Sequence, residues 1–256
     1  MAPKRGLEMS ERSVATRAVG WSWKVGRLLG VDVYVHVTFL LLFISVGLRY
    51  WLERRSIDGA LATLGFLAAL VACVLSHELG HVLTARWFRI STRDVTLLPI
   101  GGVARLQPVP PEPGQEIWIA SAGPLVSLVI AGDLYLWLWF EGQLQSIFEL
   151  TLTSGPFFER LMIANIALAI FNLLPAMPMD GGRVLCAILA RRRPRLRATE
   201  IAATIGQGMA LLFGVLGLFS IPMLVFIALV VWIGAAHEID TARADAEVDG
   251  LAVRDR

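Results

Sequence analysis

The chain has 256 residues, 56% of them hydrophobic, and its mean hydropathy of +0.65 excludes an ordinary soluble protein. Its 23 Lys and Arg residues nearly balance 21 Asp and Glu residues, so the net charge gives no sign of a nucleic-acid partner. The two cysteines, Cys73 and Cys186, both lie in apolar runs, and we expect no structural disulfide. The first 30 residues are polar and basic and lack the apolar core of a secretory signal peptide.

Apolar stretches long enough to cross a bilayer predict six transmembrane helices. They cover residues 33–51, 60–88, 117–140, 157–190, 201–219 and 221–236. The fourth stretch is too long for one straight crossing, and Pro175, Pro178 and the pair Gly181 and Gly182 interrupt it. The fold class expected is therefore an all-α polytopic membrane protein with six transmembrane helices.

The distribution of basic residues predicts the orientation of these helices. Six lie in the N-terminal segment, four around the end of the second span, and five between Arg191 and Arg197, against four in the opposite loops. Both termini are therefore expected in the cytoplasm. The domains expected are a cytoplasmic N-terminal segment over residues 1–30, a six-span domain over 31–240 and a cytoplasmic tail over 241–256.

The second span contains the pentapeptide His77-Glu78-Leu79-Gly80-His81. Four residues apart on a helix, the two imidazoles lie about 40° apart on one face, which suits a zinc ion. Glu78 is offset by about 100°, close enough to act on a water molecule at that metal. Because burying two histidines and a carboxylate in lipid costs free energy unless they bind something, the motif predicts a metalloprotease site within the bilayer.

The connector after the second span differs from the other loops. Residues 94–106 form two short, mostly apolar stretches around Gly101 and Gly102, a pattern typical of a β-hairpin. The segment is too apolar for a solvated loop and too short to span a bilayer. We expect a small membrane-associated hairpin that dips in beside the metal site, since irregular backbone at that depth needs protein cover.

A catalytic zinc ion usually takes three protein ligands, so a third ligand is expected from another span. The clear intramembrane carboxylates are Asp133 in the third span and Asp180 in the fourth. Counting about 1.5 Å per residue places His77 and Asp180 in the cytoplasmic half of a hydrocarbon core about 30 Å thick. Asp133 lies nearer the outer face and fits less well; its role is left without a prediction.

Together these motifs resemble the site-2 proteases, a family of intramembrane zinc metalloproteases that cut transmembrane substrates. The stretches that carry the resemblance are the pentapeptide 77–81, the hairpin residues 98–102, the Ser-Ala-Gly-Pro stretch 121–124 and residues 172–182. The resemblance extends over nearly all of residues 20–240. It implies one catalytic Zn²⁺ held by His77, His81 and Asp180. It also implies Glu78 as the catalytic acid/base and Asn172 as a residue that holds the substrate or polarises its carbonyl.

The resemblance further implies a location and a partner. The chain has no inserted PDZ domain and is similar to the compact prokaryotic branch, which is often followed by a pair of regulatory CBS domains. Residues 248–254 resemble the lead-in to such a pair. The expected substrate is a transmembrane protein in a prokaryotic plasma membrane, such as an anti-sigma factor or a similar single-span protein. Gly101 and Gly102 are candidates for holding an unwound substrate by strand addition.

Other interpretations of these residues stay open at this stage. Asp180 could cap a helix or pair with Arg183. Asn172 could serve merely as a hydrogen-bonding residue between helices, with no part in catalysis. Cys73, one turn before His77, could be a sulfur ligand or a small buried hydrophobe.

The alternative function is a non-proteolytic metal-binding membrane protein: a transporter, a receptor or a pseudoprotease. A transporter would spread its ligands along a path, whereas here they converge beside Glu78, which favours hydrolysis. The oligomeric state is not predicted.

Overall fold

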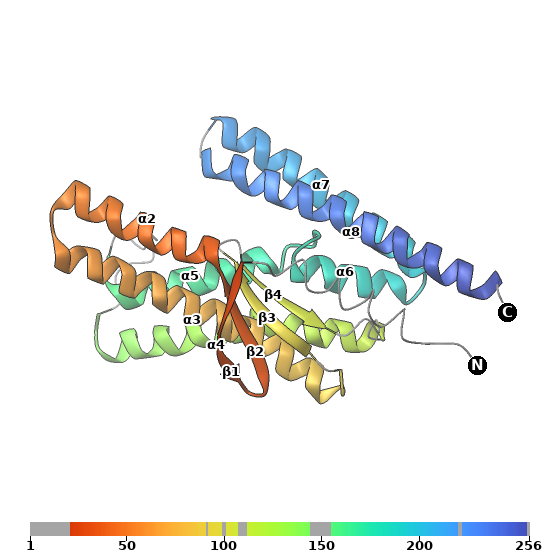
Figure 1. The fold of residues 1–256 in the computed structure, drawn as a ribbon, viewed down its shortest axis with the longest axis horizontal. Helices are drawn as coiled ribbons and strands as arrows, with labels where there is room; N and C mark the ends of the chain where they lie inside the picture. Colours follow the sequence, from red (N-terminus) through yellow and green to blue (C-terminus); the bar gives the residue numbers. More distant parts are fainter. Residues whose placement is uncertain are drawn as a thin grey trace. The chain divides into compact units, whose positions relative to one another are not determined.

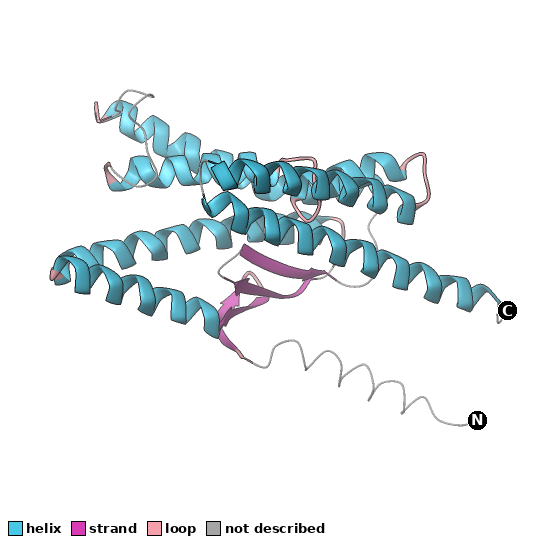
Figure 2. Cartoon of the chain, turned by 90° about the horizontal axis from the view of Figure 1, so that it is seen from above, coloured by secondary structure: helices cyan, strands magenta, loops and turns pink. Residues whose placement is uncertain are grey.

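A computed structural model describes residues 21–90, 92–98, 101–106, 112–143, 155–219 and 222–254. Helices dominate these residues, and one small sheet accompanies them (Figure 2). The chain divides into two compact units. The first comprises Met1–Glu78 and Ser91–Gln107, and the second comprises Leu79–Ile90 and Pro108–Arg256.

The first unit contains a four-stranded sheet in the order β1-β2-β3-β4. The strands are β1 (Ser22–Leu28), β2 (Val31–His36), β3 (Thr92–Leu98) and β4 (Gly101–Leu106). Strand β2 pairs antiparallel with β1 and parallel with β3, and β3 pairs antiparallel with β4. Leu98 pairs with Gly101 and Leu97 with Gly102, so the hairpin expected around the two glycines is confirmed.

Strand β1 lies where the sequence predicts a polar N-terminal tail, and strand β2 lies where it predicts the start of the first span. The first span was expected to begin at Val33, but Val33 lies in β2, and helix α2 (Val37–Arg54) begins after the strand. Leu29 and Gly30 connect β1 to β2, and both have a positive φ, as a type I′ hairpin turn requires. Val31 and Val33 are buried at alternate positions, the period of a strand and not of a helix.

Helix α2 is followed by α3 (Ile57–Trp87), the helix that carries the histidine pentapeptide. The turn between them is tight because Arg55 adopts a left-handed conformation with φ of 52°. Gly59 in the first turn of α3 lies against Tyr50 so closely that a Cβ there would overlap the phenol ring. At 31 residues, α3 is about 46 Å long and exceeds the thickness of the hydrocarbon core.

The second unit is helical. Its helices are α4 (Pro113–Phe140), α5 (Phe157–Asn172), α6 (Asp180–Ala190), α7 (Arg195–Phe219) and α8 (Pro222–Arg254). Helices α7 and α8 run side by side as an antiparallel pair (Figure 1). They close tightly because Gly217 faces the backbone nitrogen of Val225, where a Cβ would approach to 2.7 Å. The core between α6, α7 and α8 is built mostly from small residues, which lets the helices approach closely.

In the described part of the chain, four helices are long and apolar enough to cross a membrane: Ile57–Trp87, Pro113–Phe140, Arg195–Phe219 and Pro222–Glu247. They correspond to the second, third, fifth and sixth of the expected spans, and they mark the chain as an integral membrane protein. The fourth expected span, 157–190, is two helices, α5 of 16 residues and α6 of 11, joined by a turn at its prolines. Helix α2 has 18 residues, including Arg49, Glu53 and Arg54, and does not qualify by composition.

Candidate metal centre

Helix α3 carries His77 and His81 on one face, and both side chains are buried, with 3% and 5% of their surface exposed. The boundary between the two units falls inside this helix, after Glu78, and α3 runs through it unbroken. The turn of a single helix therefore sets the position of His77 relative to His81. A spacing of four residues stacks the two imidazoles one above the other.

Both ring nitrogens of His81 have oxygen partners. The Nδ1–H donates to the carbonyl oxygen of Ile119 in α4 at 2.7 Å, and Nε2 lies 3.2 Å from Oδ2 of Asp180. A carbonyl oxygen can only accept a hydrogen bond, so the proton of a neutral ring belongs on Nδ1 and leaves a lone pair on Nε2. The Ile119 carbonyl thus orients the ring, as hydrogen-bond acceptors on the far nitrogen commonly do for metal-binding histidines.

The contact between His81 and Asp180 tests whether a metal fits. The Nε2 lone pair and a carboxylate oxygen are both acceptors, and 3.2 Å between two buried acceptors is unfavourable unless a cation lies between them. Ligand bonds of about 2.0–2.1 Å in tetrahedral geometry separate two ligand atoms by about 3.3 Å, close to the distance observed. The residues present therefore fit a tetrahedral zinc site.

Glycines allow the close approach of α4 to the motif. Gly80, between the two histidines, lies where a Cβ would come within 2.9 Å of both the Ala122 carbonyl oxygen and a Val126 methyl. Pro124 lies inside α4 and lacks the N–H that would otherwise bond to the Ala120 carbonyl. This interruption occurs one turn after Ile119, in the stretch where α4 packs on α3.

Asp180 is the first residue of α6, and a folded-back turn after α5 holds it in place. A Cβ at Gly181 would overlap the carbonyl oxygens of Leu173 and Leu174, and one at Gly182 would overlap the backbone at Ala176 and Met177. The turn therefore lies directly on the N-terminus of α6. The residue that precedes the helix as its N-cap is Met179, and Asp180 pairs with the imidazole of His81 instead of capping.

Two further glycines, one on α7 and one on α8, lie in close contact with the same turn. A Cβ at Gly206 would overlap the Met177 carbonyl oxygen, and one at Gly234 would come within 2.6 Å of the Pro178 ring. The amide of Met177 also donates to the Ala202 carbonyl of α7 at 3.5 Å. The turn that precedes Asp180 is thus in close contact with α6, α7 and α8 at glycines of all three helices.

His77, His81 and Asp180 each offer one ligand atom, and these atoms lie within 4.8 Å of one another. The donor set of two imidazole nitrogens and one carboxylate oxygen is typical of catalytic zinc. Among the described residues, this group contains neither Cys73 nor Asp133. Cys73 is a buried free thiol, and Asp133 is exposed on α4, where it faces away from the protein core.

The remaining candidate residues lie on three different elements. Glu78 follows His77 on α3 and is half-buried. Asn172 ends α5, and its side-chain amide donates to the Leu168 carbonyl of its own helix at 2.9 Å, not to another helix. Gly101 and Gly102 begin β4, an edge strand of the sheet.

The sequence did not predict the hydrogen bond from His81 to the Ile119 carbonyl or the close packing at Gly80. Neither carries a chemical signature, because a backbone carbonyl is present at every position and a helical glycine is common. Pro124 marks the region only, because it leaves the carbonyl of Ala120, and not that of Ile119, without its helical donor.

Four membrane-length helices and a buried group of two histidines and an aspartate define the class of protein as a membrane metalloprotein. Residues 65–153 and 146–213 match the family model described as Peptidase family M50. The match extends over more than half of the chain, which therefore belongs to Peptidase family M50. The recognition of the site-2 protease motifs in the sequence is confirmed.

Several relatives support this assignment. A zinc metalloprotease of Methanocaldococcus jannaschii is 34% identical over 239 residues, which cover 93% of this chain and 66% of that protein. Stage IV sporulation protein FB of Bacillus subtilis is 30% identical over 158 residues, 61% of this chain and 51% of that protein. The chain thus spans about half to two thirds of the length of its curated relatives.

A solved structure also matches, the site-2 protease from Methanocaldococcus jannaschii. It has a TM-score of 0.64 and 35% sequence identity, and the match covers 86% of this chain and 95% of that one. The names of the relatives and the donor set of His77, His81 and Asp180 agree on zinc as the metal of this protein.

Proposed function

We propose that this chain is a zinc-dependent intramembrane endopeptidase that cleaves a transmembrane segment of a single-span protein. The observation that carries the proposal is the convergence of His77, His81 and Asp180 on a buried site of a membrane-length helix, with Glu78 beside them. A site of this composition in a membrane span is suited to hydrolysis of a peptide that itself lies in the membrane.

His77, His81 and Asp180 would hold the zinc ion. When bound, zinc supplies a Lewis acid that activates water and polarises a peptide carbonyl. The Ile119 carbonyl keeps the His81 ring in one tautomer and one orientation, so Nε2 is ready to bind without rearrangement.

Glu78 would act as the acid/base. It would take a proton from the attacking water and then donate it to the leaving amine. Asn172 would stabilise the oxyanion that forms on the substrate. Its amide has two N–H donors, and the bond to Leu168 uses one, so a second remains for a substrate carbonyl.

A helical substrate hides its scissile carbonyl in backbone hydrogen bonds and must unwind before it can react. Strand β4 lies at the edge of the sheet and pairs with β3 on one side, so its other side offers backbone groups for strand addition. Gly101 and Gly102 begin this strand, and glycine has no side chain that would hinder the approach of a peptide backbone. We propose that the unwound segment is held there.

The substrate class proposed is an anti-sigma factor or a similar single-span membrane protein, cut in regulated signalling. The name of Stage IV sporulation protein FB supports a regulated role, because it links that relative to a stage of sporulation.

The topology proposed has six spans, with α2 and the pair α5 and α6 added to the four membrane-length helices. Both termini would lie in the cytoplasm of a prokaryotic cell, with a cytoplasmic segment over residues 1–30, the protease domain over 31–240 and a tail over 241–256. The excess of arginine between α6 and α7 supports this orientation.

The test compares the wild type with Glu78→Gln, Asp180→Ala and a control, Asp133→Asn, which removes a membrane carboxylate outside the metal group. Zinc content and cleavage of a panel of single-span substrates are measured on the purified chain in detergent. We expect Glu78→Gln to keep one zinc ion per chain and lose at least about 10²-fold in cleavage rate, because general acid–base catalysis contributes about 10²–10⁴-fold. Asp180→Ala should lose both the zinc ion and cleavage, whereas Asp133→Asn should keep both.

Cleavage near the wild-type rate by Glu78→Gln would contradict the role of Glu78. Stoichiometric zinc in the wild type without cleavage of any substrate would instead favour the non-proteolytic alternative: a metal-binding transporter, a receptor or a pseudoprotease.

A further inference from the structure

A shallow, open groove with a volume of about 710 Å³ lies along the first three turns of α7 and the two residues before it, on a face that the metal centre does not use. Its lining is charged at one end and apolar at the other. Arg193 and Arg197 lie at the start of the groove, and Ile201 and Ile205 lie further along the helix. The groove is therefore amphiphilic along the axis of α7.

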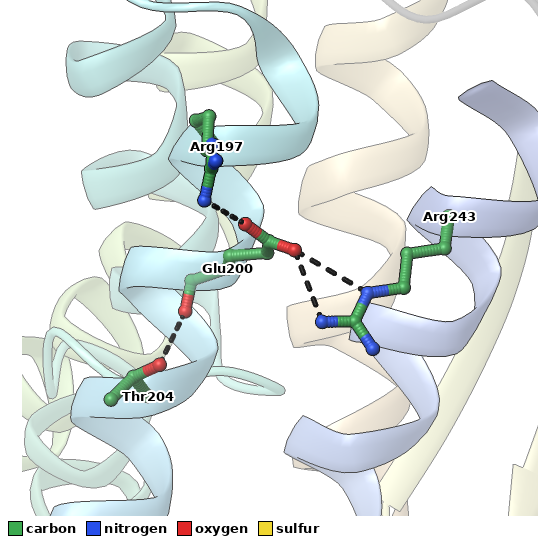
Figure 3. A network of polar contacts seen from close by, with 4 residues as sticks. All are labelled: Arg197, Glu200, Thr204 and Arg243. Atoms are coloured by element: carbon green, nitrogen blue, oxygen red, sulfur yellow. Dashed lines mark hydrogen bonds and ion pairs between the residues drawn. The ribbon is translucent and has the colours of Figure 1, made fainter.

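The charged end carries more positive charge than the protein neutralises. Glu200 is the acidic residue of the lining, and its carboxylate is shared between Arg197 at 3.2 Å and Arg243 of α8 at 3.1 Å (Figure 3). One carboxylate thus faces two guanidinium groups, and Arg193 adds a third positive charge. The local excess is about two positive charges.

The position of this charge on the helix makes the excess more unfavourable. The first turn of α7 contains no acidic residue, although the N-terminus of a helix already carries a partial positive charge. Acidic groups normally occupy such positions. Arg195 in this turn is compensated by Glu116 of α4 at 3.0 Å, so the excess charge belongs to Arg193, Arg197 and Arg243, and an external anion would lower its electrostatic energy.

The apolar end of the groove continues as a stripe along α7. Ile205 is 39% exposed and Leu212, two turns further, is 55% exposed. Gly208 lies between them, where a Cβ would meet open space, so no side chain separates Ile205 from Leu212 along this face. Spacings of four and seven residues place these positions on one face of a helix that is long and apolar enough to span the membrane.

We propose that this groove is a binding site for an anionic phospholipid. The headgroup phosphate would lie between Arg193 and Arg197, and one acyl chain would follow Ile201, Ile205 and Leu212. A lipid fits better than a free phosphate because it alone satisfies both ends of the groove. The proposal depends on membrane insertion of α7 and not on proteolysis.

The test titrates the full chain, purified in a neutral detergent, with phosphatidylglycerol or with phosphatidylcholine of the same acyl chains, and counts bound lipids by native mass spectrometry. We expect tighter binding of phosphatidylglycerol, and we expect Arg193→Gln/Arg197→Gln to weaken it roughly 30-fold, the effect of two basic groups at an anionic surface. The control Arg191→Gln/Arg192→Gln removes the same charge just outside the groove and should keep the wild-type affinity.

Glu200→Gln separates lipid binding from loss of folding, because it should strengthen binding. Removing the carboxylate frees Arg197 and Arg243 for the phosphate, so we expect roughly a fivefold or greater gain in affinity for phosphatidylglycerol. A loss of affinity in Glu200→Gln would overturn the proposal. Equal binding of the two lipids, equal losses in both double variants, or full displacement of the lipid by millimolar inorganic phosphate would overturn it as well.

Discussion

Replacing Gly80 with alanine tests how closely the geometry of the metal centre depends on the packing of α3 against α4. The new Cβ would lie 2.9 Å from the Ala122 carbonyl oxygen and 2.9 Å from a Val126 methyl, whereas ordinary contact begins near 3.4 Å. The Val126 side chain can rotate, but a backbone carbonyl inside a helix cannot. Helix α4 must therefore move away from α3 by about 0.5 Å.

That displacement acts on the residue next to Gly80. The 2.7 Å hydrogen bond from His81 to Ile119 would lengthen to about 3.2 Å, the upper end of the range for such bonds, and the ring would lose its orientation. Loss of the hydrogen-bond partner of a metal-binding histidine typically lowers metal affinity about 10–100-fold. Overpacking should also cost about 1–3 kcal/mol in the free energy of unfolding.

Gly65→Ala is the matched control, because Gly65 is on the same helix and a Cβ there meets nothing within 4 Å. It should gain up to about 1 kcal/mol from helix propensity and bind zinc as the wild type does. Zinc affinity is measured by competition with a chromogenic chelator, and stability by thermal unfolding in detergent, at about 2–4 °C per kcal/mol. If Gly80→Ala matched Gly65→Ala in both measurements, the close approach of α4 would have no part in holding the site.

Three further outcomes are expected. Gly181→Ala should release zinc, because its Cβ would overlap carbonyl oxygens of the turn before α6 and displace Asp180, the first residue of that helix. The control Gly132→Ala, whose Cβ would meet open space on α4, should keep zinc bound, and equilibrium dialysis compares the zinc content of the two variants. Chelation of zinc should lower the unfolding temperature by an amount that grows with the zinc concentration used for loading, and a scan that stayed unchanged would mean that no metal is bound to the folded state. Glu116→Gln should lower the free energy of unfolding by about 1–3 kcal/mol in thermal unfolding, because Glu116 is 4% exposed and its Oε2 lies 3.0 Å from Arg195 of α7. A stability equal to that of the wild type would mean that this ion pair contributes nothing to the stability of the fold.

The candidate site was more predictable from the sequence than the fold around it. His77 and His81 need only one helix to bring them together, so their spacing alone determines their relation. The rarity of carboxylates in membrane spans left Asp133 and Asp180 as candidates, and the count of depth along the helices favoured Asp180, in agreement with the resemblance to the site-2 proteases. Both arguments rely on the chemistry of single residues and on helix geometry, which are local.

The elements that the sequence did not reveal depend on context. Strands β1 and β2 are short. Val31 to His36 alternate apolar and polar residues with the period of a strand, but they run directly into the apolar start of α2, so a search for long apolar stretches joined the end of β2 to that helix. The parallel pairing of β2 with β3 joins residues about 60 positions apart, and no local pattern predicts it. The break after Asn172 was visible in its prolines, yet the resulting helices α5 and α6 are each shorter than one ordinary span.

The metal centre is positioned largely by backbone contacts, and membrane burial explains why. Helices in lipid gain little from burying apolar side chains against each other, so small residues and close backbone approach hold them together. The absence of a side chain at Gly80 lets α4 approach closely enough for the Ile119 carbonyl to accept from His81. In the same way, Gly206 and Gly234 let α7 and α8 contact the turn that leads to Asp180. His81 and Asp180 are therefore held by contacts that a single added methyl group would disturb. Zinc affinity should thus be more sensitive to alanine at these glycines than to the loss of a methyl group from the surrounding side chains.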